Sequence, residues 1–501
     1  MLRKLGKFFT NRIAIFAILT LLLIGFFAFA LLYLNYLSNV FYFACLIFSI
    51  FAAFEILSRD TYPEYKMAWV LVVCALPFFG IAFYFVLGRK NISKQKQLKY
   101  MSAIKDARNF LSKSANLEKD EVVQNCEKII YSHCKMPAYA AKSIHYYNSG
   151  AKFYHELIKT ISSAKDYIFL EYYIIKPGAV WNKLFEILKD KAKNGVDVRI
   201  IYDDLGSVLN LPRNFPNVMK KHKIKVVRFN RIVPLFDARM NIRNHRKTAI
   251  VDGKAAFVSG ANISDEYANI TCNLGHWKDF GAKVTGMAVN SFVVSFLDSW
   301  QKESKVQNPS ILFSPIKATK SKKIVIPFQD SPFFKSSVYE DVLLNLIYSA
   351  KHEIKITTPY LVPTGQIQAA LISACRRGVS VSICLPGTPD KKSIFEMTKA
   401  FALSLAQHGI KIYFYSPGFL HSKLFVVDNK YAVVGTSNLD LRSMHSNCEI
   451  NMFVCDFTFV CNVNEDISNI IKNSNLLSPA KKPNIFIRAY RSFVRLFSPL
   501  M

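Results

Sequence analysis

The chain has 501 residues, of which 51% are hydrophobic, and its 65 Lys and Arg against 35 Asp and Glu give a formal net charge of +30. Such a length allows two or more domains, and such a charge indicates an anionic partner: nucleic acid, an anionic membrane or a phosphate-bearing substrate. The ten cysteines form no C-x2-C pair and several lie in apolar runs, which argues against a zinc site or a disulfide framework and favours free thiols in a reducing compartment.

Residues 1–90 are predicted to form a membrane anchor. After a basic N-terminal arm comes the apolar run Ile13–Asn35, which is long enough to span a bilayer and has no signal-peptide cleavage site. Val40–Leu57 and Met67–Leu87 are two further apolar segments. Basic stretches flank the whole region, and the positive-inside rule would place both in the cytoplasm, which three spans cannot do. Either one segment is re-entrant or interfacial, or one basic flank lies outside. We expect two true spans and a cytoplasmic catalytic region.

Two similar halves follow a polar, charged connector at residues 91–130. They are expected at 131–315 and 316–479, and in each a helix is followed by strand, helix and strand. The predicted elements are Phe153–Ala164, Tyr167–Ile175, Trp181–Asn194 and Val196–Tyr202, then Val338–Ala350, Glu353–Val362, Gln366–Arg377 and Val379–Leu385. This alternation predicts an α/β fold with two sandwich halves related by an internal pseudo-twofold repeat, after a helical membrane anchor.

Each half contains the pattern H-x-K-x4-D, followed by an apolar strand, a glycine and an asparagine. The residues are His245, Lys247, Asp252 and Asn262 in the first half, and His421, Lys423, Asp428 and Asn438 in the second. The histidine and lysine open a buried strand, so they point to the same face. A single copy would be weak evidence, because a lone histidine is more often a core or surface residue. Two copies indicate function, and the halves must meet to form one two-histidine site.

Two imidazoles and two ammonium groups suit phosphoryl transfer on a phosphodiester. Lys247 and Lys423 would neutralise its charge, and Asn262 and Asn438 would donate further hydrogen bonds. One histidine can attack phosphorus to form a covalent intermediate. The other can protonate the departing alkoxide and then take a proton from the incoming hydroxyl.

Each histidine also needs a carboxylate that fixes its tautomer. Asp279 and Glu449 lie at similar distances past the histidine of their own half and are the candidates. The two segments Glu171–Tyr173 and Thr358–Tyr360, at matching strand ends, either line the substrate pocket or belong to the core.

The C-terminal segment, residues 480–501, is basic and amphipathic. Arg488, Arg491 and Arg495 recur at helical spacing, and apolar and aromatic residues fill the opposite arc. We expect a helix that lies on an anionic bilayer. The alternative is a helix packed on its own domain with a solvated arginine face.

The paired motifs resemble the phospholipase D superfamily, and their flanking sequences resemble bacterial cardiolipin synthases within it. The segments that carry this resemblance are Lys66–Gly88, Arg243–Lys247, Gly260–Tyr267, Gly275–Asp279, Thr358–Tyr360, Gly418–Lys423 and Gly435–Ser443. The resemblance covers nearly the whole chain and is weakest in residues 91–140.

The resemblance implies transfer of a phosphatidyl group from one phosphatidylglycerol to the hydroxyl of a second, giving cardiolipin and glycerol. It implies a phosphatidyl-histidine intermediate, no metal and no cofactor. In this family the first-half histidine is usually the nucleophile, so His245 is expected to attack and His421 to act as acid and base. The motif residues Asp252 and Asp428 usually serve structure there. The implied partners are phosphatidylglycerol and anionic lipids of the bacterial inner membrane, and no nucleic acid.

Rival functions remain open at this point. A phosphatidylserine synthase, which uses a nucleotide-activated lipid and serine, or a hydrolytic phospholipase D, which uses water, would share the histidines and lysines. The predicted membrane segments argue against a nuclease of the superfamily. A non-catalytic lipid-binding membrane protein would not need intact histidines and lysines in both halves.

Overall fold

The computed structural model describes residues 38–88, 120–231, 241–303, 321–478 and 484–498, with the single residues 21, 25, 108, 111 and 313. The chain divides into two compact units. The smaller unit contains the N-terminal helices, and the larger one, from residue 93 to 498 without 231–241, contains both halves. The first expected span, Ile13–Asn35, lies outside the described residues except for two positions.

The N-terminal unit is built from helices that pack on one another. Its elements are α3 (Ser38–Ser58), α4 (Pro63–Ala75), α5 (Pro77–Phe83) and the π-helix η1 (Tyr84–Gly88). Trp69, Val73 and Tyr84 pack against α3 in a small core. The second apolar segment is therefore α3, whereas the third is divided between α4, α5 and η1, and Pro77 marks the break between α4 and α5. Among the described residues, no helix is long and apolar enough to cross a membrane.

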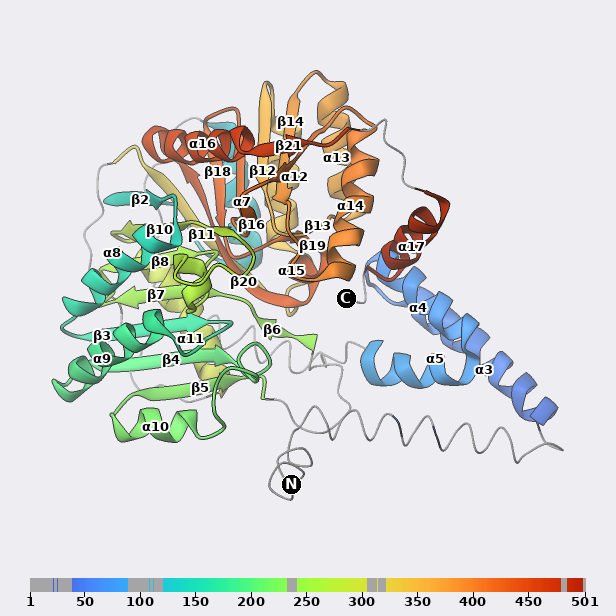
Figure 1. Ribbon diagram of the computed structural model, residues 1–501, viewed down its shortest axis with the longest axis horizontal. Coiled ribbons are helices and arrows are strands. Elements are labelled where there is room, and N and C mark those ends of the chain that lie inside the picture. The colour runs from blue at the N-terminus through green and yellow to red at the C-terminus, as the bar shows by residue number, and fades with distance from the viewer. Residues whose placement is uncertain are drawn as a thin grey trace. The chain divides into compact units, whose positions relative to one another are not determined.

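The first half contains a seven-stranded mixed sheet in the order β2-β10-β8-β7-β3-β4-β5 (Figure 1). Its strands are β2 (Ser143–Tyr147), β3 (Tyr167–Tyr172), β4 (Asp197–Asp203), β5 (Lys225–Phe229), β7 (Lys247–Val251), β8 (Ala255–Ser259) and β10 (Gly281–Thr285). Its helices are α8 (Gly150–Ser162), α9 (Ala179–Lys193), α10 (Phe215–Lys221), η3 (Asp265–Ala268) and α11 (Val289–Glu303). All six residues of β3 are buried, which explains why five of them are apolar or aromatic; the sixth is Glu171.

The second half contains the larger sheet, in the order β1-β11-β20-β18-β17-β12-β14-β15-β21. Its strands are β1 (Tyr139–Ala140), β11 (Ile324–Asp330), β12 (Glu353–Thr357), β14 (Ser380–Pro386), β15 (Lys411–Tyr415), β17 (Leu424–Val427), β18 (Tyr431–Gly435), β20 (Asn447–Cys455) and β21 (Ser474–Leu476). Its helices are α7 (Glu121–Cys134), α12 (Val338–Ser349), α13 (Gly365–Arg376), α14 (Lys392–Ala406), α15 (Leu441–His445), α16 (Phe457–Lys472) and α17 (Ile485–Leu496). Short strands complete the unit: β6 (Arg243–Asn244), β9 (His276–Lys278), β13 (Leu361–Val362), β16 (Gly418–Leu420) and β19 (Leu439–Asp440).

The predicted repeat is present in the centre of both sheets. The order β8-β7-β3-β4-β5 in one sheet matches β18-β17-β12-β14-β15 in the other, with the last three strands of each set parallel. The two breaks expected after the crossover helices also occur, because Gly195 and Gly378 take φ values of +90° and +88°, which favour glycine. Two α/β halves are therefore confirmed.

Two elements at the start of the predicted first half, the end of α7 and strand β1, pack with the second half. Helix α7, whose last residues were assigned to the first half, packs on α12 and β11 of the second. Its residues Cys126, Ile130 and Cys134 belong to the hydrophobic core of that half. Strand β1 pairs with β11. From α7 onward the chain thus starts in the second half, passes through the first and returns to the second, which a repeat in the sequence does not reveal.

Candidate active site

Two short parallel ribbons join the halves and deliver the two histidines. In one, β6 pairs with the first residues of β20, and in the other, β9 pairs with β16. A motif histidine follows each ribbon directly. His245 donates its backbone N–H to the Cys448 carbonyl at 2.9 Å, and His421 donates its own to the Lys278 carbonyl at 2.8 Å. The two connections are equivalent under the internal repeat, so the histidines come from both halves into one site.

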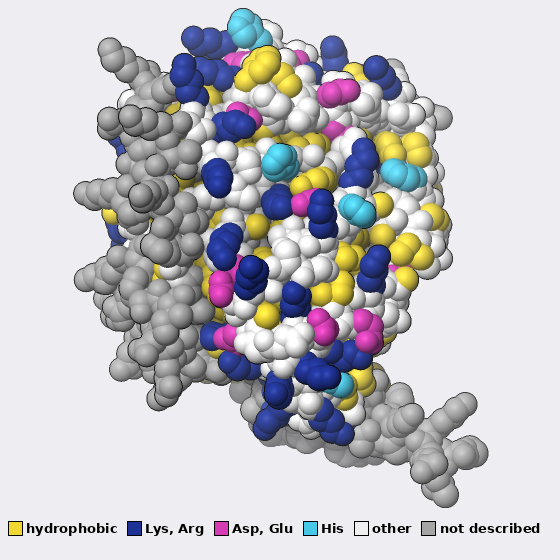
Figure 2. Space-filling view, turned by 90° about the vertical axis from the view of Figure 1, so that its left-hand side faces the viewer, with side chains coloured by type: hydrophobic (Ala, Val, Ile, Leu, Met, Phe, Trp, Pro, Cys, Tyr) yellow, Lys and Arg dark blue, Asp and Glu magenta, His cyan; other side chains and the backbone are white. Residues whose placement is uncertain are grey.

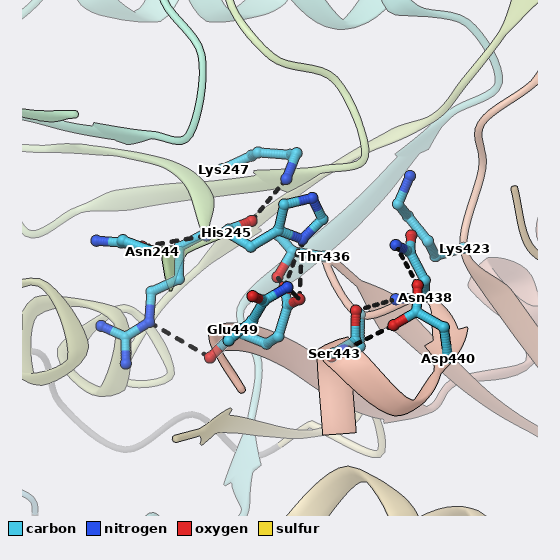
Figure 3. Close-up of polar contacts among 12 residues, drawn as sticks. Asn244, His245, Lys247, Lys423, Thr436, Asn438, Asp440, Ser443 and Glu449 are labelled. Carbon is cyan, nitrogen blue, oxygen red and sulfur yellow. Dashed lines mark hydrogen bonds and ion pairs between the residues drawn. The ribbon is translucent and has the colours of Figure 1, made fainter. Parts of the chain in front are cut away.

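Each histidine is held by a carboxylate of the other half. His245 Nδ1 lies 2.8 and 3.0 Å from the two oxygens of Glu449, as Figure 3 shows, and His421 Nδ1 lies 2.7 Å from Asp279 Oδ2. The two expected carboxylates are present, but the expected pairing within each half is wrong. Because the ribbons are parallel, the residue after β6 falls opposite the residue after Cys448, and the same holds at β9. With Nδ1 engaged, Nε2 is the nitrogen that each ring offers to a substrate.

The motif lysines lie beside the histidines and are buried. Lys247 Nζ donates to the His245 carbonyl at 2.6 Å, and Lys423 Nζ lies 2.9 Å from His421 Nδ1. Burial lowers the pKa of Lys247 to about 7 and that of Lys423 to about 8. A bound phosphodiester would stabilise both ammonium groups and raise these pKa values again. In the described part of the chain, no three or more His, Cys, Asp or Glu side chains are grouped as metal ligands, so no residue is assigned to a metal.

The pKa values of the histidines and of their carboxylates are shifted in opposite directions. Burial, reinforced by the two lysine charges, lowers the pKa of both His245 and His421 well below its ordinary value. Burial raises the pKa of Asp279 and of Glu449 to about 7. Near neutral pH both imidazoles are therefore neutral in the free enzyme, which is the form that a nucleophile needs. The histidine that acts as acid must gain its proton when the anionic substrate enters.

The pH dependence of the reaction should follow from the lysines. We expect kcat/KM to fall as the pH rises above about 7 to 8, because Lys247 and Lys423 then lose their charge in the free enzyme. The alkaline limb of kcat should lie at higher pH, because bound substrate keeps both groups protonated. Initial rates at constant ionic strength would give both profiles. A kcat/KM that stays constant from about pH 6 to 9 would contradict this assignment.

The two asparagines of the repeat differ in their surroundings. Asn262 Oδ1 accepts from the Ile174 N–H at 3.1 Å, and its Nδ2 donates to the Tyr267 hydroxyl at 2.7 Å. Asn438 Nδ2 donates to Asp440 at 3.0 Å, and its buried Oδ1 has no hydrogen-bond partner (Figure 3). Both polar side-chain atoms of Asn262 are thus used in hydrogen bonds within the first half. In Asn438 the side-chain oxygen makes no hydrogen bond. The role of both in binding phosphate stays a prediction.

The motif aspartates lie away from the histidines, at the far ends of β7 and β17. Asp252 and Asp428 have φ values of +53° and +52° and accept backbone N–H groups at the start of a neighbouring strand. The donors are Lys165, Asp166 and Tyr167 for Asp252, and Lys351, His352 and Glu353 for Asp428. These contacts favour the structural role that the resemblance implies for both aspartates.

Substitution of these aspartates should affect stability and spare the chemistry. We expect Asp252→Ala and Asp428→Ala each to lower the free energy of unfolding by about 1–3 kcal/mol, because backbone donors lose their acceptor. Denaturant unfolding would measure the loss, and kcat per folded molecule should change less than about 10-fold. Asp252→Asn, which keeps one acceptor oxygen, is the matched control. Normal stability with turnover abolished would instead mean that the aspartates have a catalytic role.

Several residues that support the site were not predicted from the motif. Arg246 is 1% exposed and donates to the Ser295 carbonyl and to Gln329, at 2.8 and 2.9 Å. Thr436 Oγ1 donates to Glu449 at 2.6 Å. The signal for Arg246 is its place between His245 and Lys247, since strand alternation points it to the opposite, core-facing side. A buried arginine there needs fixed acceptors.

Aromatic rings surround both imidazoles. The ring centroid of Tyr173 lies 5.2 Å from that of His245, and those of Tyr267 and Trp277 lie 5.3 and 5.6 Å from His421. Of the residues expected to line the pocket or join the core, Tyr173 is therefore beside a histidine. Tyr172 is 1% exposed and belongs to the core of the first half. The side chains of His245 and His421 are 13% and 9% exposed.

Comparison with known proteins bears on this geometry. The family model for the phospholipase D-like domain of cardiolipin synthase matches residues 157–275 and 343–471, and a second model, phospholipase D-nuclease N-terminal, matches 47–89. A cardiolipin synthase of Alkalihalophilus pseudofirmus is 31% identical over 465 residues, 90% of this chain and 92% of the relative. The chain belongs to the cardiolipin synthase family. Another member, from Clostridium perfringens, is 30% identical over 88% of this chain and 94% of its own length.

A solved structure agrees at the level of fold. The phosphatidylserine synthase of Haemophilus influenzae superposes with a TM-score of 0.58 at 15% identity, over 75% of this chain and 97% of that one. Both stretches matched by the cardiolipin synthase model contain strands of the central repeat. The chain is a phosphatidyltransferase of the phospholipase D type, as the paired motifs predicted.

Proposed function

We propose that this chain transfers the phosphatidyl group of one phosphatidylglycerol to the free hydroxyl of a second, giving cardiolipin and glycerol. The observation that carries the proposal is the pair of crossed histidine–carboxylate contacts, with a buried lysine beside each ring. One pair would serve as nucleophile and the other as acid and base, so a single site can run both displacements. The family relationship supports phosphatidylglycerol as the substrate.

In the first step, His245 Nε2 attacks the phosphorus of the donor lipid. The bond from phosphorus to the glycerol oxygen breaks, and His421 gives that oxygen its proton, so that neutral glycerol leaves. Lys247 and Lys423 balance the charge that develops on the phosphoryl oxygens. The assignment of attack to His245 follows the family resemblance.

In the second step, the acceptor lipid occupies the place that glycerol left. His421 takes the proton of its hydroxyl as the oxygen attacks phosphorus. The bond between phosphorus and His245 breaks, and cardiolipin is released with the free enzyme restored. The second step returns to His421 the proton that it gave up in the first and frees His245 from phosphorus, so no outside proton or electron is consumed.

The reaction requires access to a membrane. A net charge of +30 attracts anionic phosphatidylglycerol, and the face in Figure 2 carries many Lys and Arg side chains with fewer Asp and Glu. This surface, together with the apolar N-terminal sequence, supports a place at the bacterial inner membrane as a multi-pass protein with the catalytic unit in the cytoplasm. The partners are then anionic lipids, with no role for nucleic acid.

Product analysis tests the proposal. Full-length protein in detergent, given phosphatidylglycerol and a chelator, should form cardiolipin and glycerol in equal amounts by mass spectrometry. Phosphatidic acid without cardiolipin would mean that water is the acceptor and that the enzyme is a hydrolase. Turnover only with a nucleotide-activated lipid and serine would identify a phosphatidylserine synthase instead.

A further inference from the structure

Helix α17 is held on the catalytic unit by its basic side. Arg491 Nε and Nη2 both lie 2.9 Å from Glu396 Oε2 on α14. The guanidinium of Arg495 lies 4.5 Å from the ring centroid of Phe401. Val494, between these arginines in the helix, is 6% exposed and joins the core of the second half. The contact therefore combines the arginine side of an amphipathic helix with one buried valine.

The apolar side of the same helix points away from the domain. Phe486 is 81% exposed, Ile485 72%, Phe493 61% and Tyr490 48%. At 3.6 residues per turn Phe486, Tyr490 and Phe493 lie on the arc opposite Arg495, the residue that contacts Phe401. This differs from the alternative in which the helix packs on its own domain with a solvated arginine face. Exposed aromatic and aliphatic side chains in one row are unfavourable in water and mark an interaction surface.

The charges around this row favour a bilayer over a second copy of the chain. Residues 480–501 contain five basic residues and no Asp or Glu. Arg491 and Arg495 contact α14, but a symmetric dimer through the apolar row would still bring two basic segments 480–501 together, which is repulsive. An anionic leaflet instead attracts the basic residues and accepts the apolar row, with aromatic rings at the depth of the headgroups.

Helix α17 is linked to the active site through a short series of packed elements. Helix α14, which holds α17, packs on β13, and Thr398 of α14 accepts a hydrogen bond from the Leu361 N–H at 3.3 Å. Strand β13 pairs with β19, which directly follows Asn438 of the site. A membrane contact at α17 would therefore fix the position of the second-half rim of the active site relative to the lipid phosphates.

We propose that the outer face of α17 is a membrane-contact surface for an anionic leaflet, and that it holds the active site at the level of its lipid substrates. This proposal rests on the proposed function for its second part only. The first part is a statement about membrane contact and can be tested without turnover.

Fluorescence quenching tests the contact. Phe486→Trp, in full-length protein in vesicles of phosphatidylcholine and phosphatidylglycerol, should gain emission that brominated acyl chains quench strongly. Leu209→Trp is the matched control, because Leu209 is 82% exposed on the first half and belongs to no amphipathic helix. Quenching of the Phe486→Trp emission no stronger than that of the control would overturn the proposal.

Activity tests the second part. The double variant Phe486→Ser, Phe493→Ser should turn over phosphatidylglycerol in vesicles about 10-fold more slowly than the native chain, because two apolar anchors are lost. Its turnover of a short-chain, water-soluble phosphatidylglycerol should be unchanged, which also shows that it folds. Equal rates for variant and native chain on vesicles would overturn the positioning role. If the native chain makes no cardiolipin from either substrate, the proposed function fails, and the quenching result still decides the contact.

Discussion

Replacement of either His245 or His421 by alanine is expected to lower the rate of cardiolipin formation at least ~10⁴-fold, because one removes the nucleophile and the other the proton donor. The two rings act in one site, so the double variant should lose little more than either single variant. Initial rates of cardiolipin and glycerol formation, followed by mass spectrometry, measure the loss.

The control for this experiment is His408→Ala, because His408 is exposed at the end of α14 and should keep its native rate. Unfolding curves of both single variants and the double variant, compared with that of His408→Ala, would show that the site variants are folded. A His421→Ala protein with full transfer activity would overturn the two-histidine mechanism. A double variant far slower than both single variants would mean that the histidines act independently.

Glu449→Gln and Asp279→Asn are expected to lower kcat by roughly 10³- to 10⁴-fold each, while leaving the histidines in place. The amide can neither hold the Nδ1–H tautomer nor stabilise the imidazolium that forms when Nε2 takes a proton. The loss should appear in kcat more than in KM, because neither side chain needs to touch the lipid.

The crossed pairing gives this prediction a specific readout. In proteins with ¹⁵N-labelled histidine, Glu449→Gln should change the ring signals of His245 and leave those of His421, and Asp279→Asn should do the reverse. Asp252→Asn is the matched control, because Asp252 is also buried but accepts backbone N–H groups at the far end of β7. Ring signals that change within the same half as the substitution would contradict the crossed arrangement.

Much of the centre of the site could be predicted from local sequence. Strand alternation places His245 and Lys247 on one face, and the turn residues after each strand fix the position of the motif aspartate. A repeat of the same pattern predicts two α/β halves without knowledge of their packing. These features depend on residues that are close together in the chain.

The remainder depends on contacts between distant residues. Glu449 is 204 positions from His245, and Asp279 is 142 from His421, so nothing local distinguishes crossed from uncrossed pairing. For the same reason the sequence does not reveal that α7 and β1 pack with the second half. The amphipathic pattern of α17 was visible, but which side faces the domain depends on Glu396 and Phe401 of α14.

The stereochemical course at phosphorus tests the central claim most directly. Phosphatidylglycerol made chiral at phosphorus by isotopic oxygen or sulfur would be converted by the full-length protein, and the configuration of the product determined. Attack by a histidine followed by attack by the acceptor hydroxyl inverts the centre twice, so the account predicts net retention. Net inversion would mean direct transfer between the two lipids, and would contradict a phosphatidyl-histidine intermediate.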